Sequence, residues 1–193
     1  NGLEDLPWDQ EARQWLARVQ FLRRFEGDVW PDPSLEALAD RADQWLTPFL
    51  AVMNRLSQVK SLPLLQALGS LLSYDQQRQL EVKAPARLEV PTGSRIQLDY
   101  ESGEIPILAV RLQELFGLTD TPRVLDGRHP VMLHLLSPGY KPVQVTQDLA
   151  SFWRNAYRDV RKDLRGRYPK HHWPEDPLTA PPTRHAKRRG EPH

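Results

Sequence analysis

The sequence predicts an α+β fold, in which an N-terminal helical bundle precedes a small domain with a few antiparallel strands and flanking helices, followed by a basic extended tail. Over the first 83 residues, apolar side chains recur every three or four positions, which is typical of amphipathic helices. From Pro85 onward, short runs alternate between apolar and polar side chains, as strands do. Proline and basic residues predominate beyond residue 178, and such a composition buries too little apolar surface to fold alone. We therefore expect domains at residues 1–83 and 84–178 and a disordered tail at 179–193.

Start signals divide the first domain into short helices. Asp9 can cap the first helix, whose apolar stripe runs from Ala12 to Phe25. A proline or a capping residue marks each later start, at Asp32-Pro33, Thr47-Pro48, Ser61-Leu62-Pro63 and Ser73. Short linkers between such helices predict a small antiparallel bundle.

The second domain is expected to combine a hairpin, a buried strand and two helices. Residues 87–90 and 95–100 flank Pro91-Thr92-Gly93-Ser94, which predicts a hairpin with a four- or five-residue loop, and residues 131–136 form an apolar run typical of a buried strand. We expect a helix at 110–116 that ends at Gly117 and turns its polar side chains outward, namely Arg111, Gln113 and Glu114. Thr146 is expected to cap a longer helix over residues 147–164.

The charge is distributed unevenly along the chain. Residues 150–193 carry 11 Lys and Arg against 5 Asp and Glu, a net charge of +6, whereas the other 149 residues carry 15 against 20, a net charge of −5. A basic end on an acidic body indicates contact with a polyanion, and a merely solvated charged tail is the alternative.

Composition also indicates the cellular compartment in which the protein is expected. The sequence has no apolar run of transmembrane length, and its acidic first residues do not form a signal peptide. It has no cysteine, which excludes disulfides and thiolate zinc sites and fits a cytoplasmic protein. The first residue is not methionine, so we expect a fragment of a longer protein.

The residue patterns predict no catalytic, cofactor-binding or metal site. A glycine-rich loop ending in Gly-Lys-Ser/Thr is missing, so this sequence is not expected to hydrolyse ATP by itself. His171 and His172 are adjacent and would point to opposite sides of an extended segment, which makes them a poor pair of metal ligands. No arrangement of a nucleophile with a base can be inferred, so an independent enzyme is disfavoured.

The run from Arg165 to Leu178 combines cations, aromatic rings and prolines without helical or strand periodicity. Basic side chains can neutralise phosphates and flat rings can stack on bases, so this run predicts a nucleic-acid-contacting arm. The alternative is that the arm docks on its own domain. Tyr168 and Trp173 are the candidate stacking or docking rings, and the candidate phosphate contacts are Arg154, Arg158, Arg161, Arg165, Arg167 and Lys170.

Five segments together resemble one family, and they are residues 91–94, 108–117, 133–138, 143–153 and 165–171. Their order and spacing are similar to the C-terminal region of the HrpB-type bacterial DEAH-box ATP-dependent RNA helicases. The resemblance implies a parent with two RecA-like motor domains, which bind ATP and magnesium and hydrolyse the nucleotide. It assigns those cofactors to the motor domains and none to this sequence.

The resemblance leaves two functions open for this sequence. The first is a non-catalytic accessory module of an RNA helicase that contacts RNA or docks on the parent's own motor domains. The second is a protein-interaction module that recruits the helicase to another protein. No catalytic residue of the family corresponds to a position in this sequence.

Overall fold

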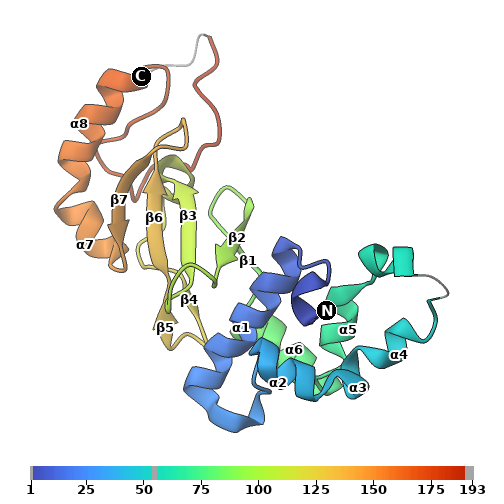
Figure 1. Ribbon diagram of the computed structural model, residues 1–193. Helices are drawn as coiled ribbons and strands as arrows, with labels where there is room; N and C mark the ends of the chain where they lie inside the picture. The colour runs from blue at the N-terminus through green and yellow to red at the C-terminus, as the bar shows by residue number, and fades with distance from the viewer. Residues whose placement is uncertain (1, 54–55, 190–193) are drawn as a thin grey trace. The chain divides into compact units, whose positions relative to one another are not determined.

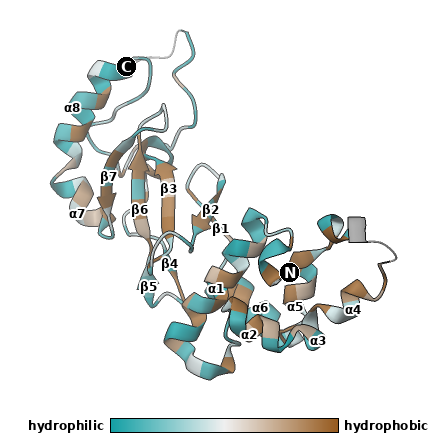
Figure 2. Cartoon of the chain, viewed as in Figure 1, coloured by the Kyte–Doolittle hydropathy of each residue, from teal (hydrophilic) through white to brown (hydrophobic). Residues whose placement is uncertain are grey.

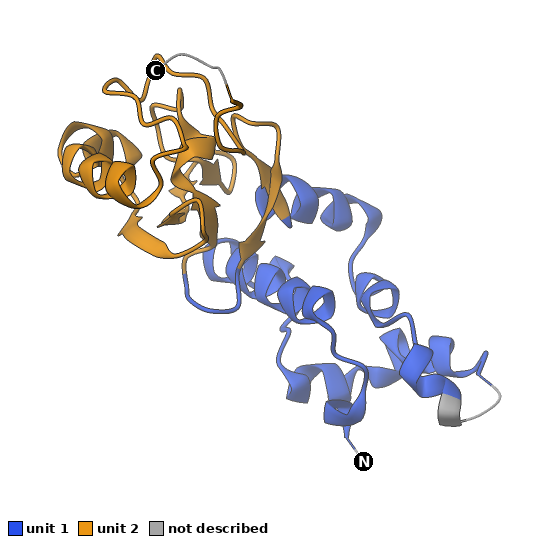
Figure 3. Cartoon of the chain, turned by 90° about the horizontal axis from the view of Figure 1, so that it is seen from above, with its two compact units in different colours: residues 1–86, 100–104 blue, residues 87–99, 105–193 orange. Residues whose placement is uncertain are grey.

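The computed structural model describes residues 2–53 and 56–189, and the chain divides into two compact units (Figure 3). The helical unit comprises the residues up to Ala86 together with Tyr100–Glu104. The sheet unit comprises Arg87–Asp99 and everything from Ile105 onward. The chain therefore enters the sheet unit, returns to the helical unit for one short segment, and leaves it again. The mixture of helices and a sheet confirms the predicted α+β class.

Helix α1 (Gln10–Glu26) is the longest element of the helical unit. As predicted, the Asp9 carboxylate caps it by accepting a 2.8 Å hydrogen bond from the Ala12 amide. Arg18 lies buried on this helix and donates from Nε to the Ala84 carbonyl at 2.7 Å. Its Nη2 lies 2.9 Å from the Glu81 carboxylate. A buried guanidinium with two acceptors thus ties α1 to α6 (Tyr74–Lys83) and to the residue after it.

The other helices are short, and the start of the second differs from the prediction. Ser34, not Asp32, caps α2 (Leu35–Asp40), because its hydroxyl accepts from the Ala37 amide. Asp32 instead accepts from the Ser34 amide, which lowers the pKa of Asp32. Ser73 does cap α6 and forms a capping box with Gln76. The remaining elements are η1 (Leu3–Asp5), η2 (Gly27–Val29), α3 (Ala42–Trp45), α4 (Thr47–Leu50), η3 (Leu56–Ser61) and α5 (Leu64–Gly69).

The expected second and third helices are interrupted. The second helix is interrupted at Arg41, whose backbone is not helical (φ −110°, ψ 14°) and which separates α2 from α3. α4 begins at Thr47, as its proline predicts, but ends at Leu50. The continuation expected beyond α4 runs into residues 54–55, which lie outside the described part of the chain. In that described part, no helix has the length and apolar character needed to cross a membrane.

The main sheet of the second unit has the order β1-β2-β3-β6-β7 (Figure 1). Its strands are β1 (Arg87–Glu89), β2 (Arg95–Asp99), β3 (Ile107–Arg111), β6 (Met132–Leu136) and β7 (Pro142–Thr146). The predicted hairpin is confirmed as β1–β2, and the predicted buried strand is confirmed as β6. The sheet is mixed, because β3 and β6 pair in parallel while the other neighbours are antiparallel. β4 (Arg123–Val124) and β5 (His129–Pro130) form a separate two-stranded sheet.

One face of β3 and β6 supplies the core of the sheet unit. Leu108 and Val110 alternate with more exposed neighbours along β3, and Leu133 and Leu135 do so along β6. These central strands are the most apolar part of the unit, whereas α8 (Tyr157–Arg167) is largely hydrophilic (Figure 2). The side chains that share this core include Leu98, Leu112, Leu115, Leu149 and Leu164.

Two helix predictions in this unit are wrong. Residues 110–116 continue β3 and then form the 3-10 turn η4 (Leu112–Leu115), in which Gln113 and Glu114 are buried rather than outward-facing. The long helix expected over 147–164 is divided at residues 155–156 into α7 (Leu149–Arg154) and α8. Asp148, not Thr146, caps α7, since its carboxylate accepts from the Ser151 amide at 2.9 Å. Thr146 instead accepts a hydrogen bond from the Asp148 amide.

The structure describes the C-terminal tail, for which composition predicts disorder, as far as residue 189. Its backbone donates two hydrogen bonds to earlier parts of the same unit, from the Thr183 amide to the Gln113 carbonyl at 3.0 Å and from the Lys187 amide to the Lys170 carbonyl at 2.9 Å. Arg184 adds a 2.6 Å bond from Nη2 to the Thr92 carbonyl. Residues 190–193 lie outside the described part.

A cluster of aromatic rings within the sheet unit joins α7, α8 and the arm to Phe116. Phe116 is fully buried, with its ring centroid 6.2 Å from that of Trp153 and 6.4 Å from those of Tyr157 and Trp173. These edge-to-face and tilted contacts are the favoured arrangement of aromatic pairs. Each of the three partner rings comes from a different element, so Phe116 is their common contact.

Phe116→Ala is therefore expected to destabilise the protein by about 3–5 kcal/mol, because it leaves a large cavity between three rings. Urea unfolding followed by circular dichroism measures the loss. Val145→Ala is the matched control, since Val145 lies in the same unit but is 56% exposed, and it should change the stability little. A Phe116→Ala variant as stable as the control would contradict the central position of this ring.

Candidate nucleic-acid interface

Four basic side chains cluster on α8, and we call Arg158, Arg161, Lys162 and Arg165 the α8 cationic face. Spacings of three and four residues bring them to neighbouring positions on one side of the helix. Together with Asn155, Asp159 and Gly166 they line a hollow in the surface of about 840 Å³. Arg158, Lys162 and Arg165 are exposed. One acidic side chain, Asp159, lines the same hollow, so the face keeps an excess of positive charge.

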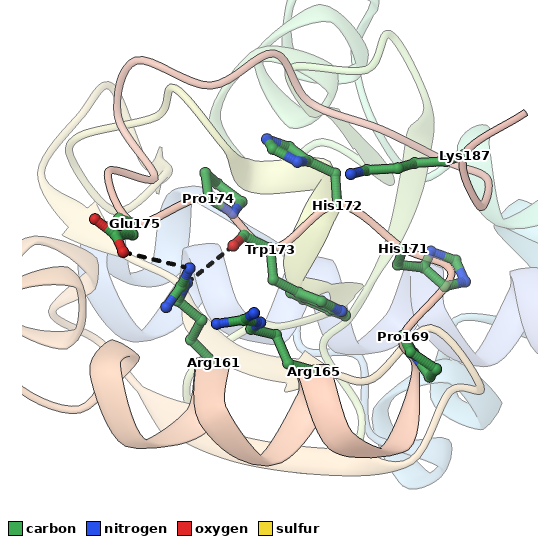
Figure 4. Close-up of a pocket in the computed structure, with 9 residues that line it drawn as sticks. All are labelled: Arg161, Arg165, Pro169, His171, His172, Trp173, Pro174, Glu175 and Lys187. Carbon is green, nitrogen blue, oxygen red and sulfur yellow. Dashed lines mark hydrogen bonds and ion pairs between the residues drawn. The ribbon is translucent and has the colours of Figure 1, made fainter. Parts of the chain in front are cut away.

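A second pocket, of about 540 Å³, adjoins this face where the arm passes over α8 (Figure 4). Arg161 and Arg165 line both hollows, so the two form one continuous surface. Lys187 reaches the pocket from the C-terminal segment. Its other lining residues belong to the arm, and they are Pro169, His171, His172, Trp173, Pro174 and Glu175.

Arg161 and Arg165 differ in how they are held. Arg161 donates from Nε to the Trp173 carbonyl at 2.9 Å, and its Nη2 lies 4.0 Å from Glu175 (Figure 4). These two contacts fix the guanidinium against the arm. Arg165 has no hydrogen bond or ion pair with any of the described residues, so its guanidinium is available to an external anion.

The two candidate rings are both docked on the domain itself. Trp173 is 5% exposed, and its indole N–H donates to the Tyr168 carbonyl at 2.9 Å. A ring this deeply buried offers no face to a base. The Tyr168 hydroxyl lies 3.1 Å from Ser137 Oγ, and this hydrogen bond lowers the pKa of Tyr168. A Cβ at position 139 would lie 2.8 Å from the Tyr168 hydroxyl, so Gly139 is needed for this close approach.

Arg154, Arg167 and Lys170 lie outside both hollows. Arg154 is exposed in the last turn of α7. Arg167 lies 3.1 Å from the Asp163 carboxylate, and its Cζ is 5.7 Å from the centre of the Tyr168 ring. Lys170 has an exposed side chain. The structure thus brings Arg158, Arg161 and Arg165 together among the predicted phosphate contacts and leaves these three at the edges.

Lys187 is a pocket residue that sequence reasoning missed, because it lies in a segment for which composition predicts disorder. A buried polar network was also missed. Glu114 accepts 2.8 Å hydrogen bonds from Thr92 and Ser94 and lies 3.2 Å from Arg111. The segments 91–94 and 108–117 are two of those that carry the family resemblance, and this network connects them.

The histidines of the arm have lowered pKa values. Burial lowers the pKa of His171, and the charges of Arg111 and His185 add to the effect. Burial also lowers the pKa of His172, reinforced by Lys187 and Arg161. His171 Nδ1 is buried and has no hydrogen-bond partner in the described part of the chain. No group of three or more His, Asp or Glu side chains suited to a metal ion occurs among the residues described.

Comparisons with known proteins agree with this architecture. A family model described as "ATP-dependent helicase C-terminal" matches residues 45–177. The "ATP-dependent RNA helicase HrpB" of Escherichia coli (strain K12) is 43% identical over 188 residues, which are 97% of this chain and 23% of that protein. A crystal structure of the E. coli DExH-box NTPase HrpB is similar with a TM-score of 0.86 over 95% of this chain and 23% of that one, at 43% identity. A crystal structure of the E. coli DEAH/RHA helicase HrpB gives 0.73 over 90% and 22%, at 41% identity.

These matches define the class of protein as the C-terminal region of an ATP-dependent helicase. The chain belongs to the ATP-dependent helicase C-terminal family of HrpB-type DEAH-box proteins, which confirms the resemblance found in the sequence. It spans about a quarter of the length of the relatives it matches.

The lowered histidine pKa values predict how stability depends on pH. In the unfolded chain these side chains take up protons below a pH of about 6.5, whereas in the folded chain they do so only at lower pH. The unfolded state therefore binds more protons in this window, and the free energy of unfolding should fall as the pH drops from 6.5 through the folded pKa.

Urea unfolding at a series of pH values checks this expectation. A His171→Gln, His172→Gln variant should lose less stability than the unmodified protein between pH 6.5 and the folded pKa, and the two should run parallel above pH 7. An equal loss in both proteins below pH 6.5 would contradict the assignment.

Proposed function

We propose that this chain is a non-catalytic accessory module of an ATP-dependent RNA helicase and that it holds the RNA backbone on the α8 cationic face. The observation that carries the proposal is the continuous basic surface shared by the two hollows, in which the Arg165 guanidinium has no hydrogen bond or ion pair with any residue that the structure describes. Guanidinium groups bind phosphate oxygens with directed, charge-assisted hydrogen bonds.

The arm supports this function without contacting bases. Trp173 is buried against Phe116, and its carbonyl orients Arg161. A cation held in place before binding loses less conformational freedom when an anion arrives. The predicted stacking role of Tyr168 and Trp173 is therefore replaced by a supporting one, in which the rings build the surface that carries the phosphate contacts.

In this proposal, ATP and magnesium belong to the motor domains of the whole protein, as the resemblance to HrpB-type helicases implies. ATP turnover there supplies the work, while this module retains RNA near the motor. A cytoplasmic setting is part of the proposal, supported by the absence of cysteine and by the RNA-helicase resemblance.

Docking on another protein surface, either a motor domain of the same protein or a separate partner, is the second candidate. It is favoured by an apolar groove of about 590 Å³ in the helical unit. Trp8, Leu16 and Leu35 line it, and Leu35 is 39% exposed. Apolar grooves rimmed by charged side chains are common at protein–protein contacts. The two candidates use different units of the chain.

The salt dependence of RNA binding tests the proposal. Fluorescence anisotropy with a labelled single-stranded RNA should give an affinity that falls linearly in log–log form with salt. Arg158→Ala combined with Arg165→Ala removes two exposed cations and should reduce the slope by about 1.4, since each phosphate contact contributes about 0.7 on single strands.

Arg87→Ala combined with Arg95→Ala is the matched control. It removes the same charge from exposed positions on the β1–β2 hairpin of the same unit, so the slope should stay as in the unmodified protein. The proposal fails if the unmodified protein does not bind RNA at low salt, or if both double variants change the slope equally. Failure to bind would favour the docking function.

A further inference from the structure

Tyr140 is the last residue of the turn between β6 and β7 and has an unusual backbone. The turn is closed by a 2.9 Å hydrogen bond from the Tyr140 amide to the Ser137 carbonyl, and Tyr140 has φ +63°. Glycine usually occupies this left-handed position at the end of a three-residue hairpin loop, because a side chain there is strained. The residue is nevertheless a large aromatic one that is 64% exposed.

Burial does not compensate for this strain. Leu125 also has a positive φ, but its side chain is 1% exposed and gains from core packing. Asp126 is a residue type that tolerates the left-handed region. Tyr74 is more exposed than Tyr140, at 78%, but it begins α6 and has no such backbone. Tyr140 thus combines a strained backbone with an exposed ring, and strain of this kind concentrates at functional sites.

One face of the Tyr140 ring is supported by a cation. The Arg111 guanidinium carbon lies 5.0 Å from the ring centre, a cation–π distance. Arg111 is itself held by Glu114 at 3.2 Å, and its side chain is 15% exposed. Because this support is fixed on one side, the exposed surface of the ring lies on the other.

The turn is also fixed to the end of α8. Ser137 Oγ accepts from the Lys141 amide at 3.1 Å and bonds to the Tyr168 hydroxyl, and Tyr168 directly follows α8. The β6–β7 turn therefore lies at the same end of the sheet unit as the C-terminal end of α8 (Figure 1). Lys141, Arg167 and Lys170 give this end exposed positive charge.

We propose that Tyr140 is a stacking platform for one base of single-stranded RNA whose backbone is held by the α8 cationic face. This inference rests on the proposed function. Stacking on an aromatic face is tolerant of sequence, since every base has a flat surface. The cationic support at Arg111 and the positive charge nearby suit a ring that receives a base flanked by phosphates.

Tyr140→Asn tests the platform, because asparagine accepts the left-handed backbone but offers no ring. The variant should bind single-stranded RNA about tenfold more weakly than the unmodified protein at constant salt. Its salt slope should stay the same, since no phosphate contact is lost. Its stability to urea should be equal or higher, because the strain at this position is relieved.

Tyr140→Phe keeps the ring and should retain the unmodified affinity. RNA that carries the fluorescent base 2-aminopurine gives a second readout, because stacking quenches the fluorescence of this base. The unmodified protein and Tyr140→Phe should both quench it, and Tyr140→Asn should abolish the quenching. If Tyr140→Asn binds and quenches as the unmodified protein does, while Arg158→Ala with Arg165→Ala binds weakly, the platform is overturned and the proposed function stands. If the unmodified protein binds no RNA, both are overturned.

Discussion

The packing of aromatic rings around Phe116 is the interaction on which the sheet unit depends. Phe116 is fully buried and contacts rings from α7, α8 and the arm, each of which is a separate element. Tyr157 adds a polar tie, because its hydroxyl donates to the Pro174 carbonyl at 2.7 Å and burial raises its pKa. These contacts hold α8 on a small core. A helix as short and hydrophilic as α8 would not be stable without such packing.

The same packing arranges the charge of the domain. Trp173 enters the cluster, which brings its carbonyl to Arg161 and carries the arm across α8. The chain then continues to Lys187, whose amide bonds to the Lys170 carbonyl. Cations from α8 and from the C-terminal segment therefore line one pocket (Figure 4). An apolar contact in the core thus determines where positive charge is displayed, and this connects the family fold to the proposed handling of RNA.

Local signals in the sequence predicted the parts of the fold that depend on neighbouring residues. The caps at Asp9 and Ser73 and the β1–β2 hairpin follow from a few adjacent side chains. Two other features depend on partners far along the chain, namely the burial of Glu114, which bonds to Thr92, and the position of Lys187 in the pocket of the arm. Composition alone predicts disorder for the tail. It cannot reveal the hydrogen bond from the Thr183 amide to the Gln113 carbonyl, because Gln113 belongs to a distant segment. The family resemblance lies in five segments jointly, so it does not depend on any single predicted element.

Whether RNA binds the α8 cationic face can be observed by mapping the RNA-induced changes in the nuclear magnetic resonance spectrum of the isotopically labelled chain. We expect single-stranded RNA to shift the backbone amides of α8 and of the β6–β7 turn together with the Arg158 and Arg165 Nε–H signals. The amides of α1, in the helical unit, should remain unchanged. Shifts confined to the helical unit or to the β1–β2 hairpin, with α8 unaffected, would contradict this expectation.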